Sequence, residues 1–144
     1  MKAEDLNKCL RGELSAIETY TQALEKARRQ QGRDAEFQQL SRILDDHQRA
    51  ASQVRTLVQQ IGGAPSQDSG AWGTWSKAVM GTAKLFGDKA ALKALKEGEE
   101  SGVKDYQSVV QDPSTPANVK SEIASILTKD QEHIRTLDQL MAAA

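Results

Sequence analysis

The stretch KDQEH, residues 129–133, places an acid and a histidine inside an apolar helical pattern. Asp130 and His133 are three residues apart, so they share one face of a helix. The apolar residues around them recur in alternating steps of four and three, as on a helix face buried in a core: Val119, Ile123, Ile126, Leu137 and Leu140. Because burying an ionisable group costs free energy unless it has a partner, the stretch predicts a polar site inside a helical bundle.

Three more helices are predicted from the same kind of pattern. They cover residues 3–31, 34–61 and 88–111, and the helix that carries Asp130 runs from residue 116 or 117 to 141. Glycine and proline end these helices at Gly32, at Gly62-Gly63-Ala64-Pro65 and at Asp112-Pro113. The predicted fold class is therefore all-α, with four helices in a bundle.

The connection between the second and third long helices, residues 62–87, is long enough to run back along the bundle. We therefore expect these two helices to be parallel, as in bundles with a crossover connection. A short helix is expected within the connection, because its apolar residues are spaced as one helix face: Trp72, Trp75, Val79, Ala83 and Phe86.

Length and composition indicate one globular domain over residues 1–144. The net charge of −1 gives no electrostatic basis for binding nucleic acid or an anionic membrane. No apolar run is long enough to cross a bilayer, and the N-terminus does not resemble a signal peptide. The single cysteine, Cys9, suits a reducing compartment, so we expect a cytoplasmic protein, either a monomer or a small homo-oligomer.

An internal repeat links the two halves of the chain. The order Glu, Tyr seven residues later and His a further 27 residues on occurs twice, at an offset of 86 residues: Glu13, Tyr20 and His47, then Glu99, Tyr106 and His133. The chain has two tyrosines and two histidines, and all four lie in this repeat. The repeat predicts two similar helical hairpins whose Glu and His side chains meet in one layer of the core.

Each of these residues also has an ordinary structural explanation. A buried histidine usually bonds to a neighbouring side chain, a glutamate at the edge of a helix seam usually reaches solvent, and a tyrosine is usually a core residue. Such residues need not share one offset, however, so the repeat favours a common site.

This pattern resembles the ferritin-like superfamily, in which a metal site takes a Glu from each of two helices and Glu-x-x-His from each of the other two. More narrowly, the chain resembles the small bacterial four-helix-bundle family DUF2383. The similarity lies in the Gly-Gly-x-Pro end of the second helix, the Trp-bearing crossover and the Glu-rich third helix ending in Tyr. The family has no established activity. The resemblance implies a ferritin-like antiparallel four-helix bundle with a long crossover.

The resemblance also implies a set of metal ligands: Glu13, His47, Glu99, Asp130 and His133. Tyr20 and Tyr106 would stand beside them. The sequence departs from the superfamily pattern at two positions, because Asp130 replaces a glutamate and Leu44 stands where the other Glu-x-x-His motif has its acid. Asp45 and Asp46 are turned roughly 100° and 200° from position 44, so they are interpreted as solvent-facing.

Carboxylate and imidazole ligands without thiolate suit one or two ions of Fe, Mn or Zn, and no organic cofactor is implied. Three functional interpretations follow. The first is a metal-binding bundle of undetermined role. The second is a bundle with a vestigial site that acts as a stress-associated or protein-binding module, its partner unknown. The third is a diiron or dimanganese oxidase or peroxidase. No catalytic residue is assigned.

Overall fold

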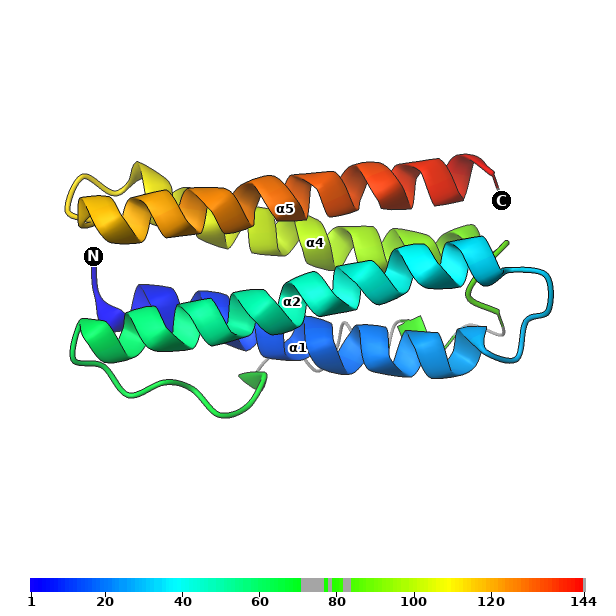
Figure 1. Cartoon of the computed structure of the whole chain (residues 1–144), viewed down its shortest axis with the longest axis horizontal. Helices are drawn as coiled ribbons and strands as arrows, with labels where there is room; N and C mark the ends of the chain where they lie inside the picture. Colours follow the sequence, from blue (N-terminus) through cyan, green and yellow to red (C-terminus); the bar gives the residue numbers. More distant parts are fainter. Residues whose placement is uncertain (71–76, 78, 82–83, 144) are drawn as a thin grey trace.

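The computed structural model describes residues 1–70, 77, 79–81 and 84–143. In this part of the chain the helices are α1 (Ala3–Ala27), α2 (Asp34–Gln60), α4 (Lys89–Gln111) and α5 (Ala117–Ala142). They form the all-α four-helix bundle that the apolar patterns predicted (Figure 1). None of the helices in these ranges is long and apolar enough to cross a membrane.

The helix ends agree with the sequence prediction to within one residue, except at the end of α1. This helix stops at Ala27, four residues before the predicted residue 31. The N–H of Gln30 bonds the carbonyl of Ala27 at 3.0 Å, so the chain tightens into a turn before it reaches Gly32. The end of α2 behaves as predicted: Gly62 has φ of 80°, and the N–H of Gly63 bonds the carbonyl of Val58 at 2.9 Å.

The chain forms two antiparallel hairpins, α1–α2 and α4–α5, which meet along α1 with α4 and along α2 with α5. Figure 1 shows that α2 and α4 run in the same direction, as the length of the crossover predicted. The resulting topology places one helix of each hairpin beside one helix of the other, so the repeated residues can meet at the centre.

The crossover is attached to α1 at both of its ends. Near the start, Asn7 donates a hydrogen bond to the carbonyl of Ala64 and accepts one from the N–H of Ser66, each at 2.9 Å. Near the end, the Gln30 side chain accepts hydrogen bonds from the N–H groups of Leu85 and Phe86. These contacts hold the two ends of the crossover against α1.

Two of the residues predicted to line the crossover helix, Val79 and Phe86, are buried in the core. The other three residues behind the prediction of a short helix, Trp72, Trp75 and Ala83, lie outside the described residues.

The core consists of two apolar clusters with a polar layer between them. One cluster includes Leu24, Leu40 and Leu137, and the other includes Leu10 and Val54, all almost fully buried. Burying one such side chain contributes about 1.5–3 kcal/mol, so the clusters hold the helices at fixed rotations. Polar residues between them are carried inward by that packing.

Candidate metal centre

All five residues predicted as ligands lie in the polar layer at the middle of the bundle. Each is at most 4% exposed, and each of the four described helices contributes at least one: Glu13 from α1, His47 from α2, Glu99 from α4, and Asp130 with His133 from α5. The structure therefore brings together all five side chains, in the layer where the internal repeat placed them.

Apolar neighbours on the same helix face explain why these acids point inward. Glu13 lies between the fully buried Leu10 and Tyr20, and Glu99 lies between Leu95 and Tyr106. The steps between these residues are three, four or seven, which keep them on one side of a helix. Burying the apolar residues above and below thus stabilises a helix rotation that also buries the carboxylate.

His47 joins the two glutamates. Its Nδ1 is 2.6 Å from Oε2 of Glu13, and its Nε2 is 2.6 Å from Oε1 of Glu99. Burial disfavours a charged imidazole, but the carboxylates of Glu99 and Glu13 outweigh that effect and raise the pKa of His47 well above its usual value. In the ion-free protein both ring nitrogens are therefore protonated and each donates to a carboxylate.

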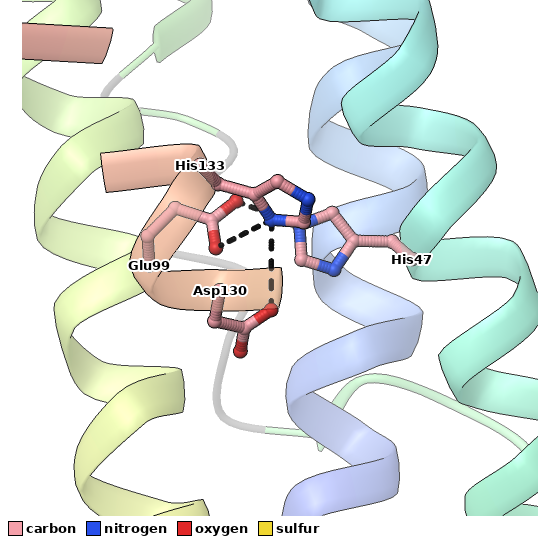
Figure 2. Close-up of side chains that lie close together, drawn as sticks. All are labelled: His47, Glu99, Asp130 and His133. Carbon is pink, nitrogen blue, oxygen red and sulfur yellow. Dashed lines mark hydrogen bonds and ion pairs between the residues drawn. The ribbon is translucent and has the colours of Figure 1, made fainter. Parts of the chain in front are cut away.

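His133 links the layer to the side of the bundle. Its Nδ1 is 3.4 Å from Oε2 of Glu99 and 3.5 Å from Oδ1 of Asp130, and both contacts are among those marked in Figure 2. Its Nε2 points the other way and lies 2.8 Å from Oδ2 of Asp46. Burial lowers the pKa of His133, but hydrogen bonds to Asp130 and Glu99 raise it to about 10.

The carboxylates respond to the same neighbours. Burial raises the pKa of Asp130 to about 7, a shift that the hydrogen bond to His133 opposes. For Glu99, burial acts in the same upward direction, but the two imidazoles outweigh it and hold the pKa below its usual value. The Glu99 carboxylate is therefore charged, whereas Asp130 exchanges its proton near neutral pH.

The two tyrosines bond to the glutamates across the hairpins. The hydroxyl of Tyr20 donates to Oε1 of Glu99 at 2.7 Å, and the hydroxyl of Tyr106 donates to Oε1 of Glu13 at 2.6 Å. Burial and these carboxylates raise the pKa of both phenols well above the usual value, so both remain protonated donors.

Asp46 is the residue that the sequence interpretation missed. The helical spacing predicts Asp46 on the solvent face with Asp45, but its side chain is only 25% exposed and accepts a hydrogen bond from His133. The reason is that the buried face of α2 includes Ile43 and Ala50, while Leu44 on the predicted stripe is only partly buried. Asp46 lies three residues after Ile43 and four before Ala50, so a helix face drawn through these two residues predicts that Asp46 points inward.

Four of the five side chains form a group that could hold a metal ion. His47, Glu99, Asp130 and His133 each offer one ligand atom, and these atoms all lie within 4.8 Å of one another. Figure 2 shows the four side chains converging from α2, α4 and α5. Glu13 stands behind this group, bonded to the outer nitrogen of His47. Nitrogen and oxygen donors of this kind suit Fe, Mn or Zn.

A cavity of about 10 Å³ adjoins the layer between α1 and α4. Glu13, Glu99 and Asp130 line it together with glycines, among them Gly98 and Gly102. A Cβ atom at Gly102 would lie 3.3 Å from Oδ2 of Asp130, so glycine there leaves room for that carboxylate. The cavity is about the size of one water molecule.

Comparisons with known proteins agree with this architecture. The model of the family described as a domain of unknown function, DUF2383, matches residues 1–112. A crystal structure described as "ferritin like, diiron-carboxylate proteins" from Bacillus anthracis str. Ames matches with a TM-score of 0.76 and 20% sequence identity, over 96% of this chain and 94% of that one. At this identity the match shows a shared fold. A search of the curated proteins gave no match.

Proposed function

The chain belongs to the DUF2383 family and has a ferritin-like fold, and we propose that it binds a divalent metal ion in the polar layer between α1, α2, α4 and α5. The observation that carries the proposal is the convergence of four buried ligand atoms, all within 4.8 Å of one another. A buried cluster of carboxylates requires compensating positive charge, which either protons on the imidazoles or a bound ion can supply.

The hydrogen bonds around the two histidines support this assignment. A histidine that binds a metal usually donates its other ring N–H to a carboxylate or carbonyl, which fixes the ring and its tautomer. Glu13 is placed to hold the Nδ1–H of His47, and Asp46 is placed to hold the Nε2–H of His133. The remaining nitrogens, Nε2 of His47 and Nδ1 of His133, both approach Glu99 and are the ones that would bind the ion.

The charges also balance. In the ion-free protein the protons on the imidazoles offset the charge of the buried glutamates. A divalent ion would replace protons in the group, and the carboxylates of Glu99 and Asp130 would match its charge. When bound, such an ion would supply Lewis-acid chemistry, and Fe or Mn would add redox chemistry.

We propose that the site holds a single ion. The full superfamily site has a fourth carboxylate at the position that Leu44 occupies, so a second ion would lack a ligand. Glu13 and the cavity beside it would be the remaining place for a second ion of Fe, Mn or Zn.

A second candidate is a bundle in which the layer is purely structural. Among the described residues, the only buried side-chain polar atom without a hydrogen-bond partner is Oγ1 of Thr19, so the layer is satisfied by its own members. A vestigial site of this kind would leave the protein to act through other surfaces, as a stress-associated or protein-binding module.

Metal analysis of untagged protein separates the two candidates. We expect about one equivalent of Co²⁺ or Zn²⁺ to bind to the chelator-treated protein, and His133→Ala to abolish that binding. Glu132→Ala, one residue away on an exposed face, is the matched control and should bind normally. A wild-type protein that retains no ion, or binding that survives His133→Ala unchanged, would favour the structural candidate. Consumption of oxygen or peroxide with Fe²⁺ then tests for oxidase or peroxidase activity.

A further inference from the structure

A pocket of about 190 Å³ lies in the groove between α2 and α5, directly beside the polar layer. Its buried polar lining is formed by Asp130 and His133, and Asp46 lies next to them. The pocket therefore reaches from the surface of the bundle to two of the proposed metal ligands. At this volume the pocket suits a small ligand rather than an extended chain.

The outer lining of the pocket carries positive charge from both helices. Arg49 comes from α2 and Lys129 from α5. Within the part of the chain that the structure describes, Arg49 makes no ion pair, and Nζ of Lys129 has only a long contact of 3.7 Å with the exposed Glu132. Exposed pairs of this kind contribute little free energy, so both cations are available to a ligand.

The acids of the pocket are already engaged. Oδ2 of Asp46 accepts a hydrogen bond from His133 at 2.8 Å, which directs its charge toward the imidazole. Asp130 faces the layer, where it is 3.5 Å from the same ring. Ser125 and Gln53 add neutral hydrogen-bond donors to the lining. The free charge and donors of the pocket therefore suit an anion.

We propose that this pocket binds a small oxyanion, such as a short-chain carboxylate or inorganic phosphate, against His133 and Asp130. Arg49 would supply paired N–H donors that match two oxygens of one carboxylate or phosphate, and Lys129 would supply a point charge from the opposite side. The inference deepens the proposed function, because the anion would lie next to the ligands of the ion.

The test is calorimetric titration of chelator-treated and Co²⁺-loaded protein with acetate and, separately, with phosphate, at constant chloride. We expect saturable binding of at least one of the two to the loaded protein, and the separate titrations identify which. The double variant Arg49→Gln/Lys129→Gln should weaken it by about tenfold or more. Arg42→Gln/Lys120→Gln removes the same charges from α2 and α5 outside the pocket and should leave binding unchanged.

Binding of neither acetate nor phosphate, or equal affinity in the two double variants, would overturn the pocket assignment. Cobalt stoichiometry, measured in the same samples, keeps the two proposals separate. Normal cobalt binding without oxyanion binding refutes the pocket alone. Oxyanion binding to the chelator-treated protein that depends on Arg49 and Lys129, in a protein that takes up no cobalt, supports the pocket and refutes the metal centre.

Discussion

Tyr20 on α1 donates a hydrogen bond of 2.7 Å to Glu99 on α4. The residues 86 positions away make the same contact in reverse: Tyr106 on α4 donates to Glu13 on α1 at 2.6 Å. The tyrosine of each hairpin thus supports the glutamate of the other. The repeat in the sequence becomes an exchange of hydrogen bonds that joins the two halves of the bundle at its centre.

Removing one of these hydroxyls should destabilise the ion-free protein. Tyr20→Phe keeps the buried ring but leaves Glu99 with one donor fewer, which should lower the free energy of unfolding by about 1–3 kcal/mol in urea denaturation. Thr128→Ala, which removes an exposed side-chain hydrogen bond on α5, serves as the control and should change stability by less than about 0.5 kcal/mol. If Tyr20→Phe left the free energy of unfolding unchanged, this hydrogen bond would not help to hold the hairpins together.

Two adjacent acids on α2 offer a matched test of how His133 is oriented. Asp46 bonds Nε2 of His133, whereas Asp45 is exposed. Asp46→Ala should weaken metal affinity by about 10- to 100-fold, the usual effect of losing the carboxylate behind a histidine ligand. Asp45→Ala should leave affinity unchanged. Equal effects of the two substitutions in a Co²⁺ titration would mean that Asp46 acts only through surface charge.

Leu44→Glu restores the carboxylate that the superfamily pattern has at this position. Leu44 corresponds to Asp130 in the repeat and is partly buried against the core, so the new acid would stand at the edge of the layer on α2. We expect the variant to bind a second ion, or to hold Fe²⁺ more tightly and consume oxygen. If the layer is purely structural, the substitution instead places an unpaired acid at a partly buried position and lowers stability by about 1–3 kcal/mol, with no gain in metal content.

The ion-free protein should lose stability as pH rises from about 7 to 10. The pKa of His133 is about 10 in the folded chain, above its usual value of 6.5, so the folded state holds a proton that the unfolded state releases in this range. His47 shifts in the same direction, and Asp130, with a pKa of about 7, adds a similar loss between about pH 4 and 7.

Metal binding should have the opposite pH dependence, because the ligands must release those protons first. Urea unfolding with a chelator should therefore show stability falling toward pH 10, while Zn²⁺ affinity rises over the same range. His133→Gln should reduce both slopes. An ion-free protein that becomes more stable as pH rises from 7 to 10 would contradict the assigned protonation of the histidines.

Much of the fold could be predicted because the apolar residues decide it. The three–four spacing on each helix and the glycine and proline breaks located four helices, and the length of the crossover gave their directions. The repeat of Glu13, Tyr20 and His47 in the second half also identified the residues that meet in the core.

The details of the layer depend on helix rotation, which the sequence pattern left uncertain by about one residue. The face of α2 is turned toward Ile43 and Ala50, and this rotation brings in Asp46 while leaving Leu44 partly exposed. Which glutamate each tyrosine bonds, and which nitrogen of His133 faces Glu99, depend on packing between helices distant in the sequence. Periodicity along one helix carries no information about such contacts.

The most direct test of the metal centre is anomalous diffraction at the zinc edge from crystals of the untagged protein grown with Zn²⁺. We predict one strong peak in the core, about 2.0–2.2 Å from Nε2 of His47, Nδ1 of His133 and carboxylate oxygens of Glu99 and Asp130. Peaks confined to the surface, with Nε2 of His47 still bonded to Glu99, would contradict the proposal.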